Sequence, residues 1–116
     1  MDHLISLEQA VQMTTTFREN KDKILQDGYQ GKDLIANAET FDRAAFDKLL
    51  AQPGCEQVRI YYGMDEALKV HAIIVGVDAA GNDLLAPSDS PSGQEPIILD
   101  IATRCPPDCP VSVLNP

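Results

Sequence analysis

The segment QVRIYYGMDEALKVHAIIVGV at residues 57–77 decides the fold. Two stretches of alternating apolar and polar residues flank a turn-like GMDEA, a pattern typical of a β-hairpin whose side chains alternate between two faces. The register that collects the apolar residues on one face places Tyr62 opposite Leu68 and Ile60 opposite Val70. We therefore expect an antiparallel hairpin with one buried face.

The second strand of this hairpin becomes apolar on both faces from Ile73 to Val77, as expected of a strand inside a sheet. Gly76 within it indicates a bulge or a close approach of another part of the chain. Together these features predict that Ile60, Val70 and Ile74 are buried beneath the helices.

Two helices are predicted before the hairpin. Ser6 and Gln9 have the spacing of a capping box, so a helix is expected to begin there and to stop before Gly28. A second helix is expected to begin at Glu39 or Thr40. Its buried face is expected to consist of Phe41, Ala45, Phe46, Leu49 and Leu50.

Beyond the hairpin, residues 87–95 are polar and predict a loop, and the alternation at 97–101 predicts a last strand. The tail at 103–116 is rich in proline and cysteine and is expected to be irregular. The chain of 116 residues has the size of one globular domain, 1–116. The predicted class is α+β, with two N-terminal helices packed on one face of a 3–4 stranded antiparallel β-meander.

Composition argues against several classes of partner. The 18 acidic and 9 basic residues give a formal charge of −9. Nucleic acid and anionic membranes bind instead to clustered Lys and Arg side chains. The N-terminus has neither the basic region nor the apolar stretch of a signal peptide, and no apolar run approaches the ~20 residues of a membrane span. We expect a soluble, cytoplasmic protein that binds no nucleic acid, no membrane and no cofactor.

One surface of the hairpin carries a cluster of cationic and aromatic side chains. The proposed register places Arg59 opposite His71 and Tyr61 opposite Lys69, on the face away from the core. Such a cluster is able to hold a carboxylate, a phosphate or an acidic partner segment. The plainer interpretation is a solvated sheet face that is balanced by Asp100 or neighbouring acids.

Cys55, Cys105 and Cys109 are the only cysteines, and with His71 they supply the residue types of a Cys3His zinc site. The C-x3-C spacing is not that of the usual C-x2-C knuckle, so a small buried Cys55 and incidental tail thiols are the alternative. We expect no disulfide between Cys105 and Cys109. In extended, proline-rich geometry their Cα atoms would lie ~12 Å apart, beyond the ~7 Å that a disulfide tolerates, and a cytoplasmic location favours thiols.

Four strings in fixed order carry a family resemblance: LLAQPGC at 49–55, RIYYG at 59–63, VGVDAAGND at 75–83 and CPPDC at 105–109. They cover roughly the C-terminal two-thirds of the chain. In these strings the chain resembles a group of small uncharacterised bacterial proteins. The resemblance implies kinship and no particular activity, although all three cysteines fall within the matching strings.

The sequence places no nucleophile, base and oxyanion group together, which argues against an enzyme. We therefore predict a non-enzymatic binding or adaptor protein that uses an exposed sheet face or an unpaired strand edge. Its partner is expected to be a protein or a small anionic ligand. The alternative is a thiol or zinc-binding protein centred on the three cysteines.

Overall fold

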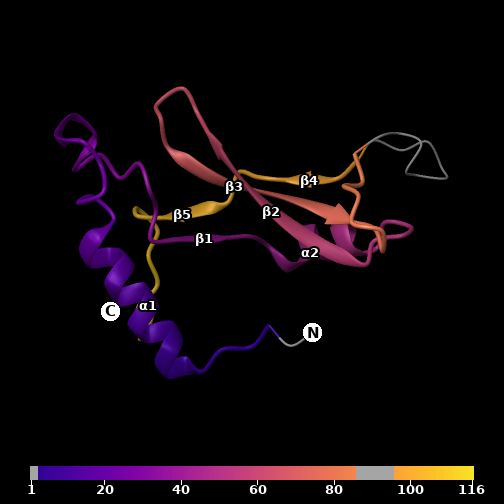
Figure 1. Ribbon diagram of the computed structural model, residues 1–116, viewed down its shortest axis with the longest axis horizontal. Helices are drawn as coiled ribbons and strands as arrows, with labels where there is room; N and C mark the ends of the chain where they lie inside the picture. The colour runs from indigo at the N-terminus through magenta and orange to yellow at the C-terminus, as the bar shows by residue number, and fades with distance from the viewer. Residues whose placement is uncertain (1–2, 86–95) are drawn as a thin grey trace.

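The computed structural model describes residues 3–85 and 96–116 (Figure 1). The expected polar loop at 87–95 lies outside the described residues. The described elements, in chain order, are α1 (Leu7–Asn20), the 3-10 helix η1 (Asp27–Tyr29), β1 (Ala38–Thr40), α2 (Arg43–Leu50), β2 (Gln57–Met64), β3 (Val70–Val77), β4 (Ile98–Leu99) and β5 (Thr103–Cys105).

The strands form two antiparallel sheets. One has the order β2-β3-β4, and the other pairs β1 with β5. The expected α+β class with antiparallel strands is confirmed, but the single meander is wrong. The tail also contains regular structure, because Thr103–Cys105 pairs with the short strand β1, in a segment where a helix start was expected.

The hairpin register differs from the expected one by four residues, since Ile60 lies opposite Ile74 and not opposite Val70. The chain turns at 65–69, where the Asp65 N–H donates to the Lys69 carbonyl (3.1 Å) and the Asp65 carboxylate accepts the Lys69 N–H (3.0 Å). These bonds close the turn two residues later than GMDEA suggested. Because the shift is even, each side chain stays on its expected face.

The core lies between α2 and the sheet. Leu49 of α2 is fully buried against Ile74 of β3 and Leu99 of β4. The partly buried side chains that pack around them are Phe41, Ala45, Phe46 and Ile97. The expected buried face of this helix is therefore confirmed except for Leu50, which is exposed.

The three hairpin residues that were expected to be buried differ in their exposure. Ile74 is buried as expected, Val70 is only half-buried, and Ile60 is 52% exposed. The prediction for Ile60 is wrong because β2 is the outer strand of its sheet, whereas α2 contacts β3 and β4. Gly76 is a close approach as expected, since a Cβ there would lie 2.9 Å from Cys55 Sγ.

Helix α1 begins with the expected capping box: the Gln9 N–H donates to Ser6 Oγ (3.0 Å), and the Ser6 N–H donates to Gln9 Oε1 (3.0 Å). The helix contains no buried residue and lies to one side of the larger sheet, beside the C-terminal tail (Figure 1). Its Arg18 guanidinium donates to the Leu114 carbonyl. The expectation that both helices pack on the sheet is therefore wrong for α1.

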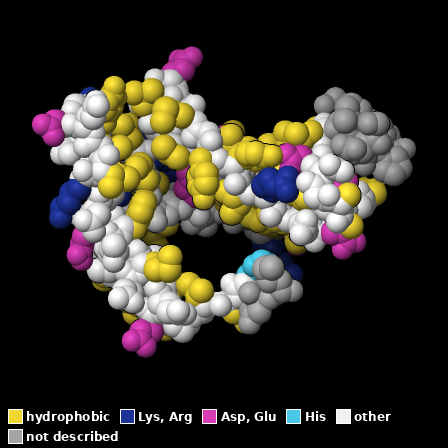
Figure 2. Space-filling view, in the orientation of Figure 1, with side chains coloured by type: hydrophobic (Ala, Val, Ile, Leu, Met, Phe, Trp, Pro, Cys, Tyr) yellow, Lys and Arg dark blue, Asp and Glu magenta, His cyan; other side chains and the backbone are white. Residues whose placement is uncertain are grey.

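Many large apolar side chains of the described residues are exposed. They include Leu4, Ile24, Tyr62 and Ile101, each more than 70% exposed. Apolar side chains are spread over the visible face (Figure 2). Among the described residues, no helix combines the length and the apolar character needed to cross a membrane.

The paired residues Ile60 and Ile74 provide a matched test of this arrangement. Ile74→Ala is expected to lower the free energy of unfolding by about 2 to 5 kcal/mol, because it empties space in the core. Ile60→Ala is expected to lower it by about 1 kcal/mol or less, since the side chain is half exposed. Urea denaturation of the two variants measures both values, and equal losses would contradict the position of β2.

Candidate functional site

The expected cationic cluster is split into two separate groups. In the first, Arg59 lies opposite Val75 and Tyr61 lies opposite Ile73. The Arg59 guanidinium and the Tyr61 hydroxyl both donate to the carboxylate of Asp83. The hydrogen bond to Asp83 is the main cause that raises the pKa of Arg59 above its ordinary value. These donors are therefore bonded within the chain.

The second group surrounds His71, which lies opposite Gly63. Its Nε2 is 2.8 Å from Asp65 Oδ2, and its Nδ1 is 3.5 Å from Asp100 Oδ1. Lys69 belongs to the adjoining turn and donates its backbone N–H to Asp65. Asp100 lies beside His71, and Asp83 and Asp65 are the neighbouring acids of this face.

The structure brings together an ion pair that the sequence did not predict. Glu39 of β1 and Arg104 of β5 lie 3.1 Å apart, and their side chains are only 14% and 13% exposed. Glu39 also accepts the Ala72 N–H (3.0 Å), while Arg104 donates to the Val70 carbonyl. The pair thus connects the small sheet to β3. The sequence held one signal for this pair: Arg104 is one of only two cationic residues beyond Arg59, in a part of the chain rich in acids.

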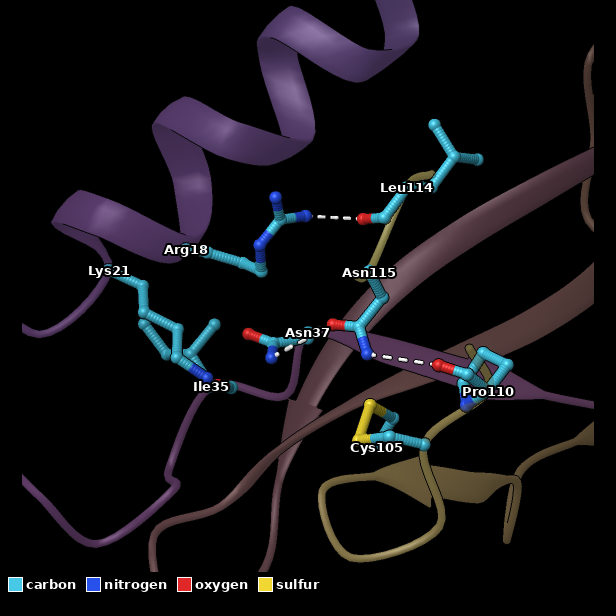
Figure 3. The surroundings of a disulfide bond; sticks show 9 residues. Arg18, Lys21, Ile35, Asn37, Cys105, Pro110, Leu114 and Asn115 are labelled. Carbon is cyan, nitrogen blue, oxygen red and sulfur yellow. Dashed lines mark hydrogen bonds between the residues drawn. A yellow bond between two sulfur atoms is a disulfide. The ribbon is translucent and has the colours of Figure 1, made fainter. Parts of the chain in front are cut away.

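Cys105 and Cys109 form a disulfide, with their Cα atoms 4.6 Å apart (Figure 3). The expectation that they remain unjoined is wrong. The chain does not stay extended through the prolines but turns, and the Asp108 N–H donates to the Arg104 carbonyl (3.0 Å). Disulfides persist in oxidising compartments, so this bond leaves the expected cytoplasmic location without structural support.

Cys55 is a free cysteine and lies apart from that disulfide, near Gly76 and Gln52. Two of the three sulfur atoms are bonded to each other, which removes their thiolates as metal ligands. No group of three His, Cys, Asp or Glu side chains within 3–85 and 96–116 is placed to hold a metal ion. The three cysteines therefore do not form a common centre, and a zinc or thiol site gains no support.

A mostly apolar pocket of about 300 Å³ lies between α1, β1 and the hairpin. Its walls include Phe17 of α1, Ala38 of β1 and Tyr62, Val70 and Ala72 of the hairpin. Pockets near this volume are at the small end of those that take ligands or partner side chains. Tyr62 of β2, in the wall of this pocket, is 81% exposed.

Strand β2 is paired on one side only within the described chain. Within 3–85 and 96–116, β3 is the only strand that pairs with it. Four apolar side chains occupy the even-numbered positions of β2, and each is more than 40% exposed: Val58, Ile60, Tyr62 and Met64. They form one face of the strand, which we call the β2 face.

Comparison of the sequence with protein-family models finds no match, and comparisons with curated proteins and with solved structures find none either. The resemblance carried by the four sequence strings therefore stays a prediction. The candidate site rests on the geometry of the chain alone.

The Glu39–Arg104 pair is expected to contribute measurably to stability. Glu39→Gln keeps the shape of the side chain but leaves the mostly buried Arg104 without its counter-charge, so unfolding should become easier by about 1 to 3 kcal/mol. Arg43→Ala is the matched control, because the Arg43–Asp47 pair is exposed (3.7 Å) and such pairs contribute about 0 to 1 kcal/mol. Thermal and urea unfolding measure both. A loss for Glu39→Gln no larger than the control's would contradict the role of the pair.

The carboxyl group of Asp65 is expected to titrate below its ordinary pKa, and its contribution to stability is therefore expected to depend on pH. Hydrogen bonds from His71 and from the Lys69 N–H lower the pKa of its carboxyl group below the ordinary value. A carboxyl with a lowered pKa stabilises the folded state fully above its unfolded pKa, near pH 4, and the contribution is lost as the pH falls through the folded pKa. An NMR titration of the carboxyl carbon measures it. His71→Ala should raise the Asp65 pKa, whereas Val111→Ala should not; an unchanged pKa in His71→Ala would contradict the assignment.

Proposed function

We propose that the protein is a non-enzymatic binding module that receives an extended polypeptide segment at the outer edge of β2. The observation that carries this proposal is an eight-residue edge strand with an exposed apolar face. An edge strand presents backbone N–H and C=O groups that a further strand can pair with, and alternate side chains then supply specificity.

The sequence of β2 supports this use of the edge. Proteins usually protect edge strands with lysine, proline, bulges or very short length. Gln57–Met64 contains no lysine and no proline, and its Arg59 is bonded to Asp83. The opposite edge strand, β4, has only two residues. Within residues 3–85 and 96–116 the long edge is therefore open to pairing, while the other edge strand is too short to offer many backbone groups.

The polar groups of the hairpin support binding more than catalysis. Arg59 and Tyr61 bond to Asp83, and His71 lies between Asp65 and Asp100. These internal pairs also weaken the case for a small anionic ligand, because the cationic groups that would bind it already contact acidic side chains of the same chain. The formal charge of −9 favours a polypeptide partner over nucleic acid.

Site-specific photo-crosslinking tests the proposal. The photoreactive residue p-benzoylphenylalanine replaces Ile60 or Tyr62 of β2 in one set of variants, and replaces the fully exposed Val111 of the tail in the control. In the native cell, β2 positions are expected to give a discrete cross-linked product of defined mass that the Val111 position does not give. Equal labelling from Val111, or no product from β2, would contradict the proposal.

A further inference from the structure

We propose that the segment received by β2 is the β2 strand of a second copy of this chain, so that two protomers form one continuous six-stranded antiparallel sheet. The inference rests on the proposed function, since it names the occupant of the same edge. Three observations support it: the charge of the strand, its symmetry and the surface that the chain leaves exposed.

The charge of β2 matches that of a second β2. The chain has 18 acidic residues, yet none lies in Gln57–Met64. The one charged residue there, Arg59, is paired with Asp83 of its own chain. Two β2 strands side by side therefore place no carboxylate opposite another, despite a formal charge of −9 on each chain. A basic segment would find no acidic residue within Gln57–Met64, and the nearby Asp83 is already bonded to Arg59 and Tyr61.

The symmetry of an antiparallel pair also suits β2. A two-fold axis that passes at Ile60 or Tyr61 pairs even-numbered residues with even-numbered residues, so the two interfaces are the same patch. The β2 faces of both protomers then lie on one side of the joined sheet. Val58, Ile60, Tyr62 and Met64 from each chain become cross-strand neighbours, the arrangement in which aromatic and β-branched side chains stabilise a sheet.

The exposed apolar side chains of β2 supply surface for such an interface. Val58, Ile60, Tyr62 and Met64 are between 41% and 81% exposed. An interface of standard size covers about 800 Å² on each partner, and these side chains supply the apolar part of it. Among the residues of β2, Tyr62 is 81% and Met64 62% exposed, so their burial supplies apolar area without disturbing the core around Leu49.

Sedimentation equilibrium of the purified full-length chain tests the inference. We expect a mass of twice 12.6 kDa, together with hydrogen-exchange protection of the β2 amides that increases with protein concentration. Tyr62→Lys replaces an exposed apolar side chain of the β2 face by a charged one in each protomer, and is expected to weaken dimerisation by at least about tenfold. Val111→Lys, at a fully exposed tail position, is expected to leave it unchanged. Circular dichroism shows that each variant is folded, and Ile60→Lys gives a second disruption of the same face.

A monomer across the concentration range would overturn the inference, as would a dimer that Tyr62→Lys and Ile60→Lys leave intact or one without β2 protection. The proposed function is tested separately by the mass of the cross-linked product. A product at twice the chain mass supports both statements. A β2 product with a different protein, together with a monomeric purified chain, retains the binding function and rejects self-association.

Discussion

Strand β3 is the constraint on which the described structure depends. It pairs with β2 along its whole length and with β4 at two positions, and its Ile74 is in the core with Leu49 of α2. Its first residues also hold the smaller sheet, since Val70 and Ala72 bond to Arg104 and Glu39. A buried, apolar strand of this kind is paired on both sides because an unpaired backbone group inside a protein is costly.

The Glu39–Arg104 pair has a different role from the other ion pairs. It lies between two sheets that share no strand, and both partners are mostly buried. Buried pairs of this kind add little stability compared with apolar packing but are costly to break, because each leaves an unpaired charge. The pair therefore fixes how β1 and β5 sit against the hairpin more than it strengthens the fold.

The outer side of the molecule differs from the core, because its apolar side chains are exposed. α1 buries no residue, and the apolar β2 face is exposed, while the acidic surface of the chain keeps copies apart in general. The acid-free β2 strand is an interruption of that surface. Because Gln57–Met64 contains no acidic residue, it is the strand at which the proposed association between copies meets the least repulsion.

The sequence by itself determined the local features: the capping box at Ser6, the hairpin, the faces on which its side chains lie, the α+β class and most of the buried face of α2. These depend on neighbours within a few residues and on periodicity.

Only the tertiary structure decided the pairing of β1 with β5, the exposure of Ile60 and the division of the cationic cluster. Pairing between short strands 65 residues apart, such as Glu39 with Arg104, leaves almost no periodic signal. The hairpin register depends on which backbone groups close the turn, and alternation fixes only the parity of that register. The turn at Asp65 therefore moved Arg59 away from His71 while leaving both on the face that the sequence predicted.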